Sequence, residues 1–176
     1  MILDSLLSFS LTAGDVPTVT AVSGNIIDLH LATGGIPVLA NLQGARDLGI
    51  GDDPALKLLV QVTATFAGGT SLAVAIQGAT DNGSGSPNAF STWWTSPVYA
   101  LATLVQGARL LDMDMPRPPA GIAIPRFLQL NYTIVGTMSG GGTLKSFIVL
   151  DRMDQLYQST ANNVMGGYPA GITIAN

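Results

Sequence analysis

A regular alternation of apolar and polar side chains from Ala55 to Phe66 is the strongest constraint on how this chain folds. Successive side chains of a β-strand point to opposite faces of a sheet, so the alternation predicts a half-buried antiparallel strand. Leu59 is the one apolar residue on the polar face. The apolar face consists of Leu56, Leu58, Val60, Val62, Ala64 and Phe66. This strand must therefore belong to a sheet that a second layer covers on one side.

Similar patterns predict strands on both sides of this segment. The Gly-rich AGGT at 67–70 separates it from the next run, which predicts a β-hairpin. GTMSGGG at 136–142 separates two later runs, and we expect a hairpin there as well. The additional runs are Pro17–Val22, Asn25–Leu31, Thr70–Thr80, Trp94–Leu101, Ala108–Met115, Arg126–Val135 and Thr143–Arg152. With about eight strands, the chain is predicted to form an all-β antiparallel sandwich or jelly roll.

The charged residues are few and of unusual kinds. All 11 acidic residues are Asp, and Lys occurs only twice. Glu and Lys are the usual solvent-facing residues of helices, so helix is expected to be a minor element. Only 10% of the residues are charged, against about 25% in an average soluble domain. We therefore expect part of the surface, including the apolar N-terminal segment, to be covered by partners.

The length of 176 residues fits a single domain. We expect the domain to comprise residues 1–152, with an extended N-terminal segment, and residues 153–176 to form a C-terminal arm. No apolar run is long enough to cross a membrane, and the N-terminus lacks the basic region of a secretory signal. The absence of Cys excludes disulfides and Cys-ligated zinc. Seven scattered basic residues and a pI near 4.5 argue against nucleic acid as a partner.

Residues capable of catalysis or metal binding are scarce. His30 is the only histidine, and Asp28 shares its strand face; we interpret both as polar surface residues rather than a metal or acid–base pair. Asp112 and Asp114 also share a strand face. A hydrolytic carboxylate pair requires a cleft and one raised pKa, so we favour two solvent-facing carboxylates. No catalytic residue is predicted.

Two Gly-rich segments resemble ligand-binding loops only in part. Asp81–Gly85 (DNGSG) lacks the closing acidic residue of a calcium loop, so we interpret it as a turn. Gly140–Gly142 precedes Lys145, but neither the spacing nor a following helix pattern matches a phosphate loop, and a hairpin turn is expected. The long segments Asp81–Ser91 and Pro116–Arg126 are expected to be functional loops. We predict no cofactor and no metal, and we expect the protein not to be an enzyme.

Adjacent tryptophans, Trp93 and Trp94, are the most unusual dipeptide of the chain. In an extended strand their rings would point to opposite faces, one into the core and one outward. An exposed ring could anchor a protein interface or stack on a sugar, and in a third interpretation both rings pack beneath the preceding loop. Five Arg against two Lys also favour fixed pairs at interfaces.

Three blocks of the sequence resemble a known family. They are MILDSLLSFS at the N-terminus, RDLGIGDDPALKLLVQVTATF at Arg46–Phe66, and RFLQLNYTIVGTMSGGGTLKSFIVLDRMD at Arg126–Asp154. The blocks are similar, in this order, to the jelly-roll capsid cement (decoration) proteins of tailed bacteriophages. Residues 81–120 and the C-terminal tail match less well.

The resemblance implies a structural protein on the outer capsid surface of a virion, assembled in the bacterial host cytoplasm. Its partners would be the major capsid protein and further copies of itself, in a dimer or trimer, with no nucleic acid, membrane or cofactor. The alternative is a carbohydrate- or receptor-binding β-sandwich of the virion surface. The residues expected at the partner interface are Leu6, Phe9, Trp93, Trp94, Arg117, Arg126, Tyr157 and Tyr168.

Overall fold

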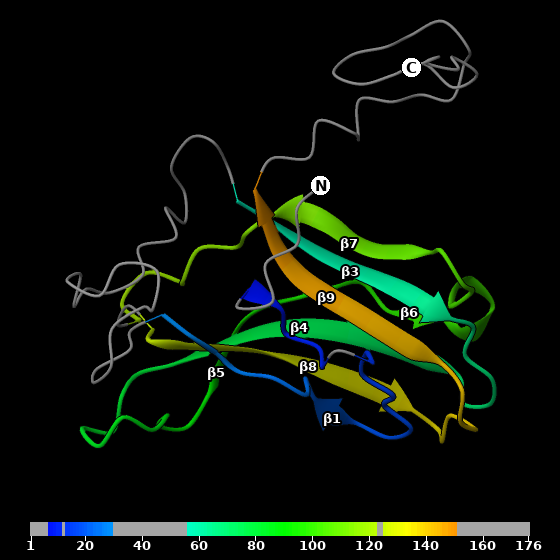
Figure 1. Ribbon diagram of the computed structural model, residues 1–176, viewed down its shortest axis with the longest axis horizontal. Helices are drawn as coiled ribbons and strands as arrows, with labels where there is room; N and C mark the ends of the chain where they lie inside the picture. The colour runs from blue at the N-terminus through cyan, green and yellow to red at the C-terminus, as the bar shows by residue number, and fades with distance from the viewer. Residues whose placement is uncertain (1–6, 12, 30–55, 123–124, 151–176) are drawn as a thin grey trace, which may run out of the picture.

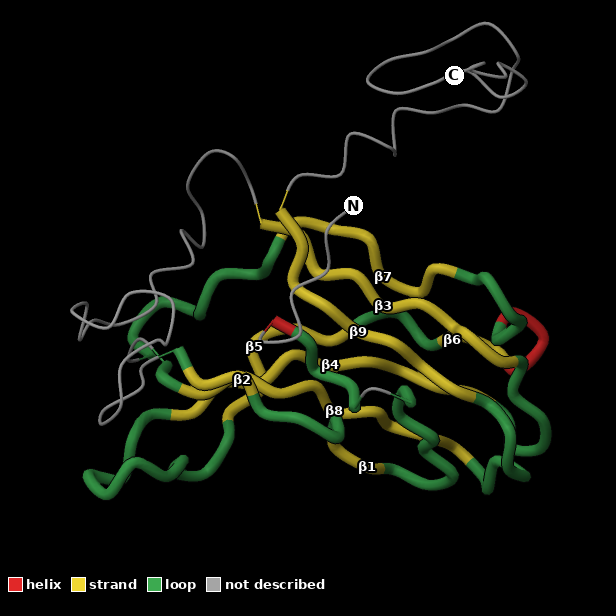
Figure 2. Tube along the Cα trace, viewed as in Figure 1, coloured by secondary structure: helices red, strands yellow, loops and turns green. Residues whose placement is uncertain are grey.

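The computed structural model describes residues 7–11, 13–29, 56–122 and 125–150. Their strands form two antiparallel sheets that lie face to face (Figures 1 and 2). The strands are β1 (Ala21–Val22), β2 (Ile27–Asp28), β3 (Leu56–Ala64), β4 (Ser71–Ala79), β5 (Ser91–Thr95), β6 (Tyr99–Ala100), β7 (Arg109–Asp114), β8 (Phe127–Val135) and β9 (Thr143–Leu150). A short 3-10 turn, η2 (Leu101–Thr103), follows β6. The predicted all-β antiparallel sandwich is confirmed.

The chain crosses repeatedly between the two layers. The larger sheet has the order β1-β8-β4-β5, with β2 also paired to β8 and β6 to β4. The smaller sheet has the order β7-β3-β9. Strands that are neighbours in a sheet are therefore mostly distant in sequence, which is typical of jelly rolls and other Greek-key sandwiches.

Neither of the two predicted hairpins, at residues 67–70 and 136–142, forms. β3 pairs with β7 and β9, whereas β4 pairs with β8, β5 and β6, so residues 65–70 cross from one sheet to the other. Residues 136–142, including Gly140–Gly142, likewise cross from β8 to β9. Each flanking strand has an apolar inner face, and placing the strands in opposite sheets lets these faces cover one another. The crossings also support each other, because Gly68 bridges Met138 and the Ser139 N–H donates to Ala67 O at 2.7 Å.

The core lies between the sheets and follows the predicted alternation. On β3, Leu58, Val60 and Val62 are fully buried. Leu59 on the opposite face is also buried, next to Phe147 in the register with β9. The core side chains of the facing sheet include Leu72, Val74, Ile76, Leu128, Leu130 and Tyr132. Burial of these apolar side chains supplies the main stabilisation of the sandwich.

Several strand boundaries differ from the predicted ones. Only the last two residues of Pro17–Val22 form a strand, β1. The expected strand Trp94–Leu101 is two strands, because Ser96–Val98 interrupts the ladder at a proline, which has no N–H to donate. Ser96 instead accepts a hydrogen bond from the Val74 N–H through its side chain at 2.9 Å.

Residues 7–11 and 13–29 form a strap along one side of the sandwich, from β9 of the smaller sheet to β8 of the larger one. Apart from β1 and β2 it is irregular, and its hydroxyl groups replace missing backbone acceptors. Ser10 Oγ accepts from the Ser146 N–H, Thr20 Oγ1 from the Ile134 N–H, and Ser23 Oγ from the Leu130 N–H, each at 3.0 Å. The strap therefore closes this side without forming a continuous strand.

Candidate functional site

The exposed large apolar side chains are concentrated on the strap. Five of the nine among the described residues belong to it, and we call these five the strap surface. They are Leu11, Val16, Val19, Val22 and Ile26, with exposed fractions of 41–58%. Scattered exposed apolar side chains are ordinary, but several on one short segment indicate a contact surface.

Next to the strap, the outer face of the larger sheet is free of charge over its central rows. Gln129 donates to Gln77 at 2.8 Å, and Gln77 donates to Thr92 at 3.0 Å, which forms a ladder across β8, β4 and β5. We call this set the amide face; it comprises Ala73, Ala75, Gln77, Thr92, Thr95, Gln129, Asn131 and Thr133. Its three threonines are exposed, whereas Ala73, Ala75 and Gln129 are buried. The outer face of the smaller sheet instead holds two ion pairs, Lys57–Asp114 and Arg109–Asp112.

The two tryptophans lie on the same side of β5. Between Ile76 and Gln77 the register of β4 with β5 shifts, and Trp93 is the extra residue of this bulge. Trp94 is paired with the inward-facing Ile76, and the Trp93 indole lies over Gly78. Both rings are half-buried against the core. The expectation that the rings point to opposite faces is therefore wrong, because a β-bulge interrupts the alternation.

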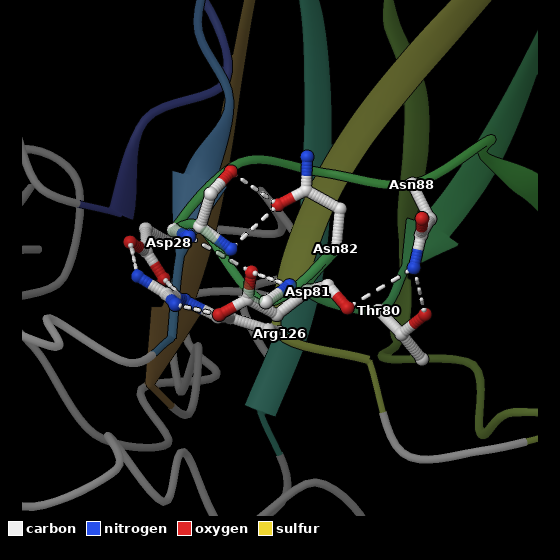
Figure 3. A network of polar contacts seen from close by, with 9 residues as sticks. Asp28, Thr80, Asp81, Asn82, Asn88 and Arg126 are labelled. Carbon is white, nitrogen blue, oxygen red and sulfur yellow. Dashed lines mark hydrogen bonds and ion pairs between the residues drawn. The ribbon is translucent and has the colours of Figure 1, made fainter.

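Arg126 joins three segments at one end of the larger sheet. Its guanidinium binds both carboxylate oxygens of Asp28 at 2.9 Å, and it also pairs with Asp81 (Figure 3). The guanidinium stacks on the Phe127 ring, with its carbon 4.8 Å from the ring centre. The hydrogen bonds to Asp28 and Asp81 outweigh burial and raise the pKa of Arg126 above its usual range. Arg126 is thus engaged within the chain, where it fixes the start of β8.

The segment Asp81–Ser91 is a tightly hydrogen-bonded loop. Asp81 Oδ1 accepts from the Gly83 and Gly85 N–H groups at 2.9 and 3.0 Å, which confirms the predicted turn. The Asn88 side chain holds the other end by donating to Thr80 Oγ1 and Asp81 O, both at 3.0 Å (Figure 3). Burial raises the pKa of Asp81, but its hydrogen bonds and Arg126 outweigh burial and lower the pKa overall. The Arg126 guanidinium therefore already pairs with the carboxylates of Asp28 and Asp81, which a metal ion would otherwise use as ligands.

The remaining candidates for chemistry are two carboxylates of β7, a glycine-rich segment and one histidine. Asp112 and Asp114 are on the outer face of the smaller sheet, in the ion pairs given above. The Gly140–Gly142 crossing leads into strand β9 and not into a helix. Among the described residues, no group of three or more His, Asp or Glu side chains is placed to hold a metal ion. His30 lies outside the described residues.

Comparison with protein families matches residues 11–148 to the family Bbp16. The chain belongs to the Bbp16 family. The match begins within the strap and ends in β9, so the shared Bbp16 region includes the strap surface, the amide face, the tryptophans and Arg126. No curated protein matches the chain. In the described part of this Bbp16 chain, no helix is long and apolar enough to cross a membrane.

The residues expected at the partner interface differ in their exposure, and some of them lie outside the described residues. Phe9, just before the Bbp16 region, is fully buried in the core, so its side chain is not part of the surface and the expectation for it is corrected. Phe9 stands between Ser8 and Ser10, and this polar sequence context does not predict a buried side chain. Arg117 is exposed within the long loop after β7. Leu6, Tyr157 and Tyr168 lie outside the described residues, as does the C-terminal arm 153–176.

A buried polar network, which no sequence pattern predicted, lies where the strap meets the two sheets. The Asp15 carboxylate accepts from the Tyr132 hydroxyl at 2.9 Å and from the Gly24 N–H at 3.1 Å. Tyr132 in turn hydrogen-bonds Ser146 Oγ at 3.0 Å. A lone Asp in an irregular segment gives no signal of burial. Gly24 packs against this carboxyl group in the structure, where a Cβ would lie 2.6 Å from Asp15 Oδ1.

Proposed function

We propose that this chain is a structural virion protein that binds the outer surface of a phage capsid and cements neighbouring major capsid protein subunits. Its resemblance to jelly-roll capsid cement proteins and its all-β sandwich support this role. It also associates with further copies of itself and performs no catalysis.

The strap surface is the observation that carries the proposal. Its side chains are aliphatic, project from a segment anchored to both sheets, and lie beside the uncharged amide face. Burying the exposed half of one such side chain contributes about 1 kcal/mol. One contact of this kind is weak, but symmetric repetition over a shell makes many weak contacts effective together.

The stabilising mechanism is mass action. A protein that binds the assembled lattice and not the separated subunits shifts the equilibrium toward the lattice. An already ordered contact surface favours cementing, because ordering a mobile segment on binding would cost conformational entropy. The hydroxyl-mediated hydrogen bonds of Ser10, Thr20 and Ser23 provide this order in advance.

Substitution within the strap surface tests the proposal. In Val19→Lys, the loss of apolar burial and the desolvation of an ammonium group should weaken binding to capsids that lack this protein by roughly tenfold. Val105→Lys is the matched control, because Val105 is exposed to 47% and Val19 to 52%, but Val105 lies outside the strap. Sedimentation with capsids and thermal disruption of the shell provide the measurements. Absence of capsid binding by the wild-type protein would overturn the proposal.

A further inference from the structure

Besides the pairing of β1 and β2 and the hydroxyl contacts, one buried residue of the strap, Asp15, bonds to both sheets. Asp15 exchanges two backbone hydrogen bonds with Leu144 of β9, each at 2.9 Å. Its side chain reaches Tyr132 of β8 in the opposite sheet. The residue is exposed to only 7%. Asp15 is therefore the point at which the strap, the smaller sheet and the larger sheet meet.

Within the described part of the chain, no positively charged side chain forms an ion pair with this carboxylate. Of the described elements packed against it, β8 contributes the titratable group of Tyr132, and β9 contributes Lys145, whose side-chain stem passes Gly14. The donors to the carboxylate among the described residues are neutral: the Tyr132 hydroxyl and the N–H groups of Gly24 and Leu11. Burying a charge without a counter-ion is costly.

The network accommodates either protonation state without moving. When Asp15 is ionised, Tyr132 donates to Asp15 Oδ2 and Ser146 donates to the Tyr132 hydroxyl oxygen. When Asp15 carries a proton on Oδ2, it donates to Tyr132, and Tyr132 donates to Ser146 Oγ, because either hydroxyl of that pair can be the donor. The two protonation states of Asp15 therefore differ mainly in one respect: the ionised state buries a negative charge that must be desolvated.

We propose that Asp15 is a pH-sensitive clasp, which holds the strap to the sandwich most firmly when its carboxyl group is protonated and less firmly once it is ionised. Burial raises the pKa of Asp15 above 3.8, despite the opposing hydrogen bonds from Tyr132, Gly24 and Leu11. Because the folded state binds the proton more tightly than the opened state, the clasp is strongest below 3.8 and weakens as the pH rises through the raised pKa. The strap surface is carried by this segment, so the clasp sets how rigidly that surface is presented.

Hydrogen exchange detected by mass spectrometry tests the clasp in the full chain. Protection factors of strap peptides, corrected for intrinsic exchange, should fall severalfold between pH 3.5 and pH 7, about the range set by an ordinary and a raised carboxyl pKa. In Asp15→Asn, which keeps the shape and places an amide donor toward Tyr132, protection should stay constant over this range. The exposed Asp114→Asn should behave like the wild type.

The loop 81–91 gives an internal control of opposite sign. Its Asp81 has a lowered pKa, so its contribution to stability is present above 3.8 and is lost as the pH falls through the lower folded value. Strap protection that is independent of pH in the wild type, or that changes with pH equally in Asp15→Asn, would overturn the proposal. So would a strap that is less protected in Asp15→Asn at every pH, since the carboxylate would then be a structural acceptor only.

Discussion

Tyr132 connects the two sheets at the scale of a single side chain. It is fully buried, and its hydroxyl group lies between Asp15 on the strap and Ser146 on β9. Tyr132→Phe removes this hydroxyl and leaves two buried oxygens with one partner fewer. We expect a loss of about 1–3 kcal/mol in the free energy of unfolding, measured by urea denaturation.

Tyr99→Phe is the matched control for this prediction. Tyr99 also links the sheets, because its hydroxyl donates to Leu110 O of β7, but the residue is only partly buried. Water can replace the lost partner there, so the loss should be smaller. An equal or larger loss in Tyr99→Phe would contradict the importance assigned to the buried network.

Single residues show what sequence patterns do and do not predict. The turn at Asp81 followed from residue types that form local hydrogen bonds, and the structure contains those bonds. The positions of Phe9 and Asp15 depend on contacts with β8 and β9, more than a hundred residues away in the chain. Local periodicity contains no information about such contacts.

At the scale of elements, the β4–β5 pair depends on a glycine. A Cβ at Gly78 would lie 2.2 Å from Cζ2 of Trp93, so the indole occupies the place of a side chain. Gly78→Ala must displace the ring or the bulged strand, at a cost of about 1–3 kcal/mol in the free energy of unfolding. Tryptophan fluorescence and chemical denaturation measure both effects.

A second substitution tests whether the cost of Gly78→Ala arises from the steric clash with Trp93. Trp93→Leu removes the ring that the new Cβ would strike, so Gly78→Ala should cost much less in the Trp93→Leu background than in the wild type. The difference is the coupling energy of a double-mutant cycle. A cost that is the same in both backgrounds would show that the destabilisation arises from the backbone of β4 and not from Trp93.

The strands were predictable and their partners were not. β3, β4, β8 and β9 begin and end close to the residues expected from alternation and turn-forming residues. The Gly68–Gly69 turn has two positive φ angles, 68° and 67°, which suit a hairpin as well as a crossing between sheets. The packing of the inner faces across the sandwich decides between a hairpin and a crossing. That packing depends on all the strands together.

At the scale of the whole molecule, the two sheets present different outer faces. The outer face of the smaller sheet carries two ion pairs, whereas the central rows of the larger sheet form the amide face beside the strap surface, and the ion pairs of Arg126 lie at one end of that sheet. The low charge content of the chain is therefore unevenly distributed over its described surface. Contacts made through the uncharged side depend on apolar burial and neutral hydrogen bonds, which salt screens very little.

This asymmetry predicts how the protein associates with itself. Light scattering of the purified protein should give a mass that is a multiple of 18.1 kDa, and the mass should be unchanged when the salt concentration is raised to about 1 M, where charge–charge interactions are screened within a few ångströms. The double variant Thr92→Lys, Thr95→Lys should be monomeric, because it places two ammonium groups in the exposed part of the amide face and leaves the strap surface unchanged. A wild-type mass that falls with added salt would contradict the prediction, since association would then depend on charged contacts such as those of the smaller sheet.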